Sequence, residues 1–328
     1  MFTTMEDIQF FIKPLYVENL VLIDGISRAG KFFLGKIVSG FENMEYFQHI
    51  SILEHLPFFT RLGSISRNAA VALIRIAVDE HSYYMRIGRN LNLRMDDASS
   101  VHNSPRWHDY VKRSVSTLDD LEGAIADKNR YNLFVLHECL ASIDIFFEAF
   151  PCMKWINLLR HPIDLVHSWY LRGWGYRFTT DPLSFFPMIK GEKSATPWFA
   201  WNRRDDFVKT SGIDSIIFSI ASLMELGQKA FLNIEPSHKR QVVSICYEDL
   251  VENTSRILEV LSSFLEDSPS DGMQVILSRE KCPRVLSEEK RKAKMEDIQQ
   301  IANQESFKLL LHLVNEYESG NYYRIFQQ

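Results

Sequence analysis

The stretch NLVLIDGISRAGKFFLGKIV (residues 19–38) predicts a strand, a tight loop and a helix in succession. Leu20–Ile23 is an apolar run too short for a core helix and is typical of a buried strand. Gly25 and Gly30 then bracket a loop that contains Arg28 and is followed by Lys31, and apolar residues at helical spacing come next. Backbone N–H groups in such a loop can turn toward an anion. The stretch therefore predicts a phosphate-binding loop at the end of a strand.

A second stretch, KWINLLRHPIDLVHSWY (residues 154–170), repeats this arrangement. Trp155–Leu159 reads as a strand with Arg160 at its end, and Pro162 suits the first turn of a helix. Ser168 follows Arg160 by about two helical turns, so a guanidinium and a hydroxyl can converge on one phosphate. Two such segments predict a doubly wound parallel α/β sheet that holds the phosphates of one nucleotide at helix N-termini.

The first loop also satisfies a more specific pattern. Gly25 to Lys31 matches the P-loop sequence of glycine, four residues and Gly-Lys. The next position of that pattern is Ser or Thr, whose hydroxyl binds magnesium, and here it is Phe32. Because a phenyl ring cannot bind a metal, we expect nucleotide chemistry without a loop-bound magnesium.

Together the segments resemble the nucleotide motifs of the sulfotransferases that use 3′-phosphoadenosine 5′-phosphosulfate. GISRAGKF (25–32) resembles their 5′-phosphosulfate loop, Gly-x-Pro-(Arg/Lys)-Ser-Gly-Thr-Thr. RHPIDLVHSWY (160–170) resembles their 3′-phosphate motif, Arg-Asn-Pro-x-Asp-x-x-x-Ser-x-Tyr. YEDL (247–250) resembles the Tyr-Glu-Asp-Leu that closes a late strand in the family. The resemblance covers residues 19–266.

The resemblance implies a donor site, and the chain departs from the family at some of its positions. Arg28 stands where the family has its catalytic Arg or Lys. Lys31 and Phe32 replace two threonines, and Lys31 can supply charge in their place. Phe33 stands where many members stack a Trp on adenine, although core packing is an equal explanation. The implied donor-binding residues are Gly25, Ser27, Arg28, Ala29, Gly30, Lys31, Phe32, Phe33, Arg160 and Ser168.

The implied reaction moves a sulfuryl group from this donor to a hydroxyl or amine, leaves 3′-phosphoadenosine 5′-phosphate, and needs no metal. It also needs a general base beside Arg28 and Lys31. His137 ends a predicted strand, 133–136, and falls where the family places its catalytic histidine. His49 and Glu54, with the neighbouring His55, are alternatives in a region where other branches carry a catalytic carboxylate.

Length and composition suit one large α/β core. The chain has 328 residues, of which 46% are hydrophobic, so we expect a single domain over 1–328. Acceptor-binding inserts are predicted at 41–130, which is mostly helical, and at 171–212, which has no clean period. The aromatic residues of the second insert suit a sugar-stacking platform or, alternatively, the anchoring of a long loop; they include Trp174, Tyr176, Trp198 and Trp201.

Charge and cysteine content exclude other classes. The formal net charge of −5 argues against a general nucleic-acid binder. Four cysteines without metal or disulfide spacing indicate reduced thiols. The N-terminus has no signal pattern and no run reaches 18 apolar residues. We therefore expect a cytoplasmic protein without a membrane span. The resemblance implies a small-molecule or glycan acceptor, and the aromatic and polar residues of 171–212 suit a carbohydrate.

The C-terminal region carries a basic run that predicts a solvated helix face; its residues are Lys290, Arg291, Lys292 and Lys294. The family uses a basic C-terminal segment to cover the 3′-phosphate, and the candidates here are Arg279, Lys281 and Arg284.

Two other functions fit parts of the sequence. A P-loop kinase is suggested by the Gly25–Lys31 pattern but is opposed by Phe32, and it gives Arg160 and Ser168 no role. A catalytically silent, nucleotide-binding relative of the sulfotransferases is suggested by the lost threonines. The sequence leaves the acceptor open among a carbohydrate, a lipid, a peptide tyrosine and a small alcohol.

Overall fold

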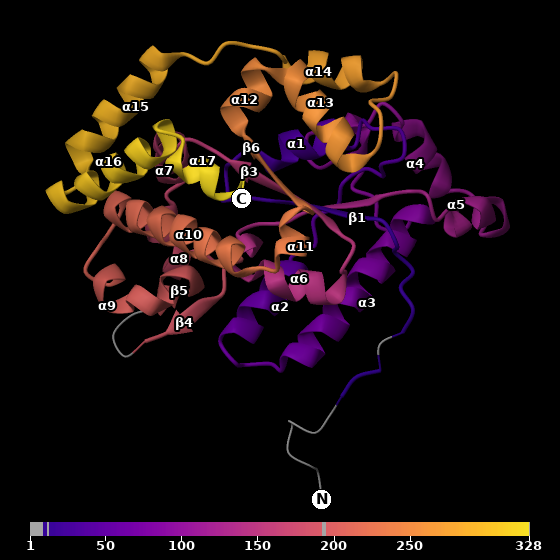
Figure 1. Ribbon diagram of the computed structural model, residues 1–328, viewed down its shortest axis with the longest axis horizontal. Helices are drawn as coiled ribbons and strands as arrows, with labels where there is room; N and C mark the ends of the chain where they lie inside the picture. Colours follow the sequence, from indigo (N-terminus) through magenta and orange to yellow (C-terminus); the bar gives the residue numbers. More distant parts are fainter. Residues whose placement is uncertain (1–8, 12, 192–194, 328) are drawn as a thin grey trace, which may run out of the picture.

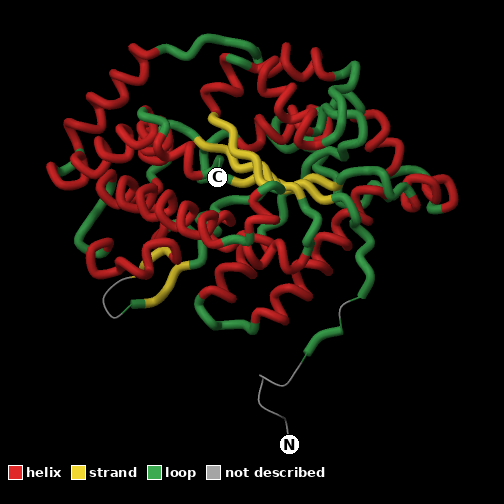
Figure 2. Tube along the Cα trace, viewed as in Figure 1, coloured by secondary structure: helices red, strands yellow, loops and turns green. Residues whose placement is uncertain are grey.

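The computed structural model describes residues 9–11, 13–191 and 195–327. A parallel sheet with the strand order β2-β1-β3-β6 crosses the middle of the molecule (Figures 1 and 2). Its strands are β1 (Leu20–Asp24), β2 (Asn132–Val135), β3 (Lys154–Leu159) and β6 (Val242–Cys246). The predicted α/β class with a parallel sheet is confirmed.

Helices fill the connections between the strands. Between β1 and β2 lie α1 (Lys31–Val38), α2 (Ile52–Arg61), α3 (Arg67–Arg86), α4 (Trp107–Arg113) and α5 (Glu122–Ala126). Between β2 and β3 lies α6 (Ile143–Ala149). The insert at 41–130 is thus mostly helical, as its sequence predicts.

The connection from β3 to β6 is the longest in the second half of the chain. It contains α7 (Pro162–Tyr170), α8 (Trp174–Thr180), the antiparallel strands β4 (Met188–Lys190) and β5 (Ala195–Pro197), α9 (Arg204–Phe207), α10 (Ile213–Asn233) and α11 (Pro236–Lys239). After β6 follow α12 (Tyr247–Glu252), α13 (Thr254–Leu265), α14 (Met273–Glu280), α15 (Glu288–Ile301), α16 (Gln304–Glu318) and α17 (Asn321–Ile325).

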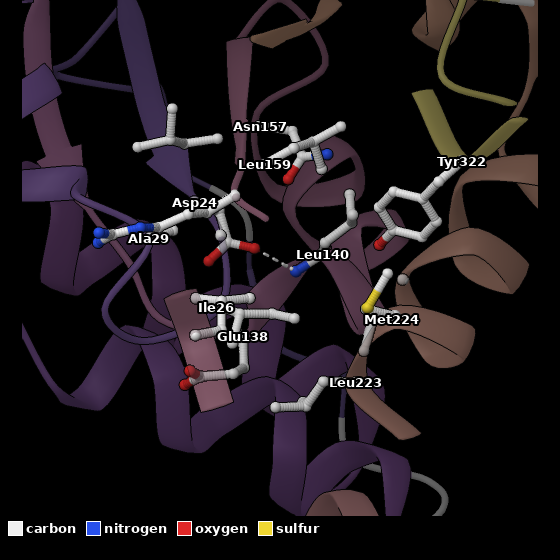
Figure 3. Close-up of a pocket in the computed structure, with 16 residues that line it drawn as sticks. Asp24, Ile26, Ala29, Glu138, Leu140, Asn157, Leu159, Leu223, Met224 and Tyr322 are labelled. Carbon is white, nitrogen blue, oxygen red and sulfur yellow. Dashed lines mark hydrogen bonds between the residues drawn. The ribbon is translucent and has the colours of Figure 1, made fainter. Parts of the chain in front are cut away.

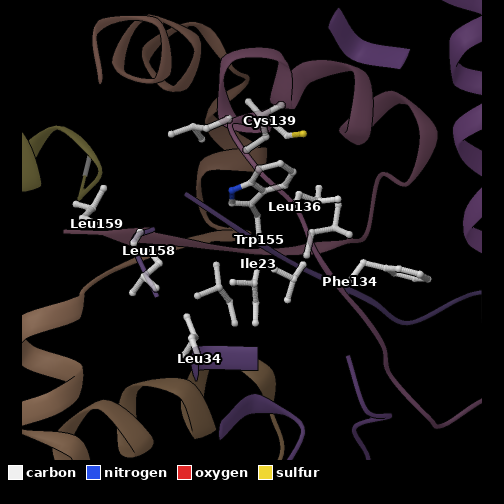
Figure 4. Close-up of a cluster of buried hydrophobic side chains, with 14 of the residues drawn as sticks. Ile23, Leu34, Phe134, Leu136, Cys139, Trp155, Leu158 and Leu159 are labelled. Carbon is white, nitrogen blue, oxygen red and sulfur yellow. The ribbon is translucent and has the colours of Figure 1, made fainter. Parts of the chain in front are cut away.

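The sheet is covered by helices on both faces. In Figure 1, α1, α12, α13 and α14 lie above the sheet, and α3, α6 and α10 lie below it. Every residue of β1 and β2 is buried, as expected for parallel strands that bury both faces. Figure 4 shows Trp155 and Cys139 on one side of the strands and Leu34 on the other. The short apolar runs of the sequence therefore form the centre of a layered core.

The strand order places a topological switch point, at which successive connections run in opposite directions along the sheet, between β1 and β3. The chain leaves β1 toward β2 on one side, whereas β3 pairs with the other side of β1. In doubly wound sheets, ligands bind at the carboxyl ends of the strands at such a point. The loop that follows β1 and the residues that follow β3 both lie at this edge.

The beginning of the 41–130 insert extends the sheet beside β2. The backbone N–H of Gln48 donates to the carbonyl of Leu133 at 2.9 Å, and the N–H of Val135 donates to the carbonyl of Gln48 at 2.8 Å. These two bonds fix the position of His49 beside the end of β2. A residue from a distant part of the sequence is thereby brought to the same edge.

By length and composition, α10 resembles a membrane-crossing helix. Of its most apolar window, 61% is buried inside the fold, where α10 packs against α7 and α16. All four cysteines are free thiols; Cys139 is buried and Cys152 is exposed.

Candidate active site

Four chain segments meet at the carboxyl edge of the sheet. The loop that starts at Gly25 follows β1, and His137 lies just beyond β2. Arg160 follows β3, and Tyr247 follows β6. The parallel pairing of all four strands places these residues on one side of the molecule. The residues selected from the two sequence motifs are therefore brought to the same edge.

The two glycines of the loop are required by its backbone. Gly30 has φ +106°, and a Cβ there would lie 2.8 Å from the ring of Tyr247. A Cβ on Gly25 would lie 2.4 Å from the carbonyl oxygen of Leu158. Arg28 also has a positive φ, +74°. The loop thus packs against β3 and β6, and α1 begins directly after it with first-turn N–H groups that have no intrahelical partner.

Side chains from the two motifs are in direct contact. The Nε–H of Arg28 donates to the Oγ of Ser168 at 3.1 Å. Arg160 donates from Nη1 to the backbone carbonyl of Arg28 at 2.6 Å. The indole N–H of Trp169 donates to the carbonyl of Ser27 at 2.8 Å. The helix that begins after β3 is therefore bound to the loop that follows β1.

Arg28, Arg160 and Arg172 form an arginine cluster, and the nearby charge of Arg160 is one of the causes that lower the pKa of Asp164, after its hydrogen bond and charge interaction with Lys294. Burial lowers the pKa of Arg28, and the charges of Arg172 and Arg160 lower it further. Within the described residues, none of the three pairs with a carboxylate within 4.0 Å, and the buried Nε of Arg160 has no hydrogen-bond partner. Guanidinium groups held together without counter-ions favour a multiply charged oxyanion.

Lys31 is buried beneath the loop rather than directed at its mouth. Its Nζ donates to the carbonyl of Gly25 at 2.6 Å, and burial lowers its pKa against the opposing charges of Glu138 and Asp24. Burial also raises the pKa of Asp24 to about 6. Figure 3 shows Asp24 accepting a hydrogen bond from the backbone N–H of Leu140. The ammonium group is thus held among buried carboxylates.

The small cavity in Figure 3 lies between the strand ends, α10 and α17. Its volume is about 30 Å³, which is the size of one or two water molecules. A nucleotide does not fit there. Arg160 lines this cavity as well as belonging to the arginine cluster.

Glu138 is a buried residue of this region that sequence reasoning missed. It has a left-handed backbone with φ +57°, and its carboxylate accepts a hydrogen bond from the N–H of Ser27 at 2.5 Å. Burial raises its pKa. The only sequence signal was an acidic residue next to His137 at a strand end. Glu138 fixes the loop after β1 to the segment after β2.

Three of the four candidates for the general base, His137, His49 and Glu54, form one cluster, to which His55 contributes no atom. Oε1 of Glu54 lies 2.7 Å from Nδ1 of His137 and 3.0 Å from Nε2 of His49. Burial alone would raise the pKa of Glu54, but the hydrogen bonds with His137 and His49 lower it to about 2. Burial and the charge of Lys31 lower the pKa of His137, against the opposing effect of Glu54. We call these three residues the imidazole–carboxylate cluster.

Phe32 lies between this cluster and the loop. Its ring centroid is 6.0 Å from each of the rings of His49 and His137, and 5.4 Å from that of Phe47. Phe32 and His49 also line an open cavity of about 440 Å³. The other side of the cavity belongs to the 41–130 insert and includes Asn90, Asn92, Asp97 and Ser99. The predicted acceptor region thus has a cavity beside the cluster whose lining is part polar and part apolar.

Phe33 belongs to an aromatic group with Tyr247. The two rings lie edge to face with centroids 5.9 Å apart. The guanidinium of Arg160 lies 4.4 Å from the centre of the Tyr247 ring. Arg284 donates to the hydroxyl of Tyr247 at 3.0 Å and lies 5.9 Å from the ring of Phe33. This group stands beside the arginine cluster, where a base of a bound nucleotide can stack.

Of the C-terminal basic residues, Arg284 is the one that the structure brings to this edge. Arg279 donates to the backbone carbonyls of His102 and Asn103. No contact of the Lys281 side chain connects it to the loop in the described structure.

Only part of the basic run on α15 is exposed to solvent. Arg291 and Lys294 pair with the buried carboxylate of Asp164 on α7, which corrects the sequence prediction for these two residues. Lys290 and Lys292 are exposed. Two of the cations therefore attach α15 to the helix that begins after Arg160.

The 171–212 insert contains short elements that its sequence did not predict, among them α8 and the β4–β5 hairpin. Trp174 packs against Trp169, with centroids 4.7 Å apart, and Trp198 packs against Phe58 at 5.7 Å. Tyr176 is 64% exposed, and the guanidinium of Arg204 covers the ring of Trp201. Trp174 and Trp198 therefore anchor the insert, the alternative to a sugar platform that the sequence left open.

The chain is similar in structure to several sulfotransferase domains. No protein-family model matches it, and no curated protein matches its sequence. The sulfotransferase domain from the curacin biosynthetic pathway is 15% identical, with a TM-score of 0.45; the match covers 90% of this chain and 98% of that domain. The sulfotransferase domain of the Synechococcus PCC 7002 olefin synthase is 12% identical, with a TM-score of 0.43 and 98% of both chains covered.

Sulfotransferase STF1 from Mycobacterium tuberculosis H37Rv is 11% identical, with a TM-score of 0.41 and with 85% of this chain and 76% of that chain covered. These identities and TM-scores are low. The function proposed below therefore depends on the residues of this chain.

Proposed function

We propose that the chain is a sulfotransferase that moves a sulfuryl group from 3′-phosphoadenosine 5′-phosphosulfate to a hydroxyl or amine of an acceptor. The observation that carries the proposal is that the arginine cluster and the imidazole–carboxylate cluster lie at the same carboxyl edge of the sheet. The arginine cluster, with Ser168, stands ready for phosphate. The imidazole–carboxylate cluster supplies a base beside an open cavity.

The loop and the arginine cluster fit a nucleotide with two phosphate-bearing positions. Gly25 and Gly30 let the loop pack closely against Leu158 and Tyr247, and the first-turn N–H groups of α1, which have no intrahelical partner, are available to an anion. The buried, unpartnered Nε of Arg160 and the hydroxyl of Ser168 fit a 3′-phosphate. Arg28 stands between the two sites, and Phe33 and Tyr247 offer aromatic surface for adenine.

In the proposed reaction the acceptor oxygen attacks sulfur while the bond from sulfur to the 5′-phosphate oxygen breaks. The leaving phosphate gains negative charge. Arg28 and the N-terminus of α1 stabilise that charge. Lys31 adds positive charge from beneath the loop, although its Nζ is held by the carbonyl of Gly25.

His137 takes the proton of the acceptor. Glu54 is ionised and faces Nδ1 of His137, so it holds the tautomer in which Nδ1 carries the proton. The lone pair of Nε2 is then available as the base, and Glu54 stabilises the imidazolium that forms. This division of roles makes His137 the base and Glu54 a positioning residue.

The acceptor occupies the cavity beside Phe32. Its volume of about 440 Å³ suits a small molecule or one glycan unit, and its amide, hydroxyl and carboxylate groups suit a polyhydroxylated acceptor. Phe32 provides no metal ligand, so donor binding requires no magnesium. The free thiols agree with a reducing, cytoplasmic location.

The first test compares ligands by thermal stabilisation. Adenosine 3′,5′-bisphosphate should raise the unfolding temperature without metal, because a ligand that binds the native state stabilises it by mass action, about 2.7 kcal/mol at a hundredfold excess over its Kd. ATP with magnesium should stabilise the protein less. The reverse order would favour a kinase and contradict the proposal.

The second test follows transfer of the radiolabelled sulfuryl group to a panel of acceptors, starting with glycans. Transfer to at least one hydroxyl or amine is expected. Tight bisphosphate binding without transfer to any acceptor class would instead indicate a silent binding protein.

A further inference from the structure

The side chains of the imidazole–carboxylate cluster can bind a metal ion as well as accept a proton. Its potential ligand atoms are Nε2 of His49, Oε1 of Glu54 and Nδ1 of His137, and all three lie within 4.8 Å of one another. They come from three separate segments: the residue after the Gln48 bridge to β2, the first turn of α2, and the second residue after β2. Their convergence is therefore a property of the fold and not of a short sequence motif.

Two imidazoles and one carboxylate are a donor set typical of Zn²⁺ sites that keep an open coordination position. Zinc binds imidazole nitrogen and carboxylate oxygen at about 2.0–2.2 Å, which places neighbouring tetrahedral ligand atoms roughly 3.3 Å apart. The carboxylate oxygen now lies 2.7 Å from one nitrogen and 3.0 Å from the other. These two distances would each have to lengthen by a few tenths of an ångström to reach that spacing, and the two nitrogens already lie within 4.8 Å of each other.

The ligands are held in place and remain accessible. The backbone bonds of Gln48 fix His49, and Phe32 packs against both imidazoles. The side chains of His49, Glu54 and His137 are 32%, 17% and 25% exposed. His49 lines the open cavity, so an ion can enter from solvent by that route.

We propose that Zn²⁺ binds His49, Glu54 and His137 and holds the protein in an inactive state. Zinc would bond to Nδ1 of His137, and the proton of Nδ1 would move to Nε2 by exchange with solvent. Nε2 would then be an N–H donor with no lone pair for the acceptor proton. The binding part of this proposal is independent of the reaction, whereas the inhibition rests on the proposed sulfuryl transfer.

The binding test titrates metal-free protein with Zn²⁺ against a chromophoric zinc chelator. A Cys152→Ser background removes the exposed thiol as a competing ligand. One zinc per chain is expected. His49→Ala and Glu54→Gln should each weaken zinc binding by about tenfold or more. His55→Ala is the matched control, because His55 neighbours Glu54 on α2 but contributes no atom to the cluster.

Zinc binding that is unchanged in both His49→Ala and Glu54→Gln, or no binding in the parent protein, would overturn the site. A circular dichroism spectrum and unfolding temperature like those of the parent confirm that each variant is folded.

The inhibition test measures sulfuryl transfer with and without Zn²⁺. Activity should fall as the site fills and return on addition of a chelator. Full activity with zinc bound would overturn the inactive-state proposal while leaving the sulfotransferase assignment intact. Zinc binding in a protein that transfers no sulfuryl group would contradict the assignment and support the site.

Discussion

The two halves of the sheet edge hold charge in opposite ways. Between β1 and β3, the residues of the arginine cluster form no ion pair within 4.0 Å among the described residues. Between β1 and β2, the Glu54 carboxylate pairs with both imidazoles of the imidazole–carboxylate cluster. The first half therefore offers unpaired positive charge to an anion, whereas the acidic and basic groups of the second half pair with one another.

This difference separates binding from chemistry. Uncompensated guanidinium groups are suited to hold phosphate in the ground state. A neutral imidazole oriented by a carboxylate contributes mainly when a proton moves. Mutations in the two halves should therefore affect different kinetic parameters, and the predictions below test that separation.

The largest effect is expected at His137. His137→Ala should lower turnover by roughly 10²-fold or more, because it removes the base, while bisphosphate affinity stays within a few-fold. Turnover is followed by transfer of the labelled sulfuryl group, and affinity by calorimetry. The control is His312→Ala, which alters an exposed histidine on α16. Near-native turnover would move the base to His49 or Glu54, and loss of the folded state would make His137 a structural residue.

A smaller, purely binding effect is expected at Arg160. Arg160→Ala should weaken adenosine 3′,5′-bisphosphate by roughly 10- to 150-fold, since a hydrogen bond to a charged group contributes about 1.5–3 kcal/mol. Adenosine 5′-phosphate, which lacks the 3′-phosphate, should bind almost as before. Arg279→Ala is the matched control, because the Arg279 guanidinium donates to the carbonyls of residues 102 and 103, away from the loop after β1. Equal weakening of both ligands would show that Arg160 acts through the loop structure.

The half of the sheet edge between β1 and β3, which holds the arginine cluster, was largely predictable from sequence, because its residues belong to two short sequence motifs. Short apolar runs fix the strands, and a glycine loop or a proline-started helix follows each one. The predicted strand 20–23 extends to Asp24, and 133–136 is shifted by one residue to 132–135. Once the strands pair in parallel, Arg28, Arg160 and Ser168 must lie near one another.

The half of the sheet edge between β1 and β2, which holds the imidazole–carboxylate cluster, was predictable only as a set of alternative general bases. His49, Glu54 and His137 could not be joined from sequence, because their meeting depends on the irregular bridge of Gln48 to β2. The same holds for the bond of Glu138 to the loop and for the pairing of α15 with Asp164. These contacts connect residues far apart in the chain and follow no period.

A moderate effect with a defined pH signature is expected at Glu54. Its carboxylate raises the pKa of His137, while burial and Lys31 lower it below the usual 6.5. Glu54→Gln should therefore lower the pKa of His137 further, so the acid limb of the pH–rate profile moves to lower pH. The plateau rate should fall by about tenfold, the value of one charged hydrogen bond of about 1.5 kcal/mol. An acid limb that moves to higher pH would contradict the assigned roles.

The smallest effect on affinity and rate is expected from removing metal with a chelator. This experiment tests whether the loop after β1 needs magnesium. Phe32 occupies the position at which a P-loop hydroxyl would bind magnesium, and its ring packs against His49 and His137. A chelator should therefore leave bisphosphate affinity unchanged, and it should not lower the rate of sulfuryl transfer. Both quantities are measured in protein stripped of metal, with and without added magnesium. A rate that collapses on chelation and returns with magnesium would mean that the half with the arginine cluster needs a metal as its partner, and the contrast between the two halves would no longer hold.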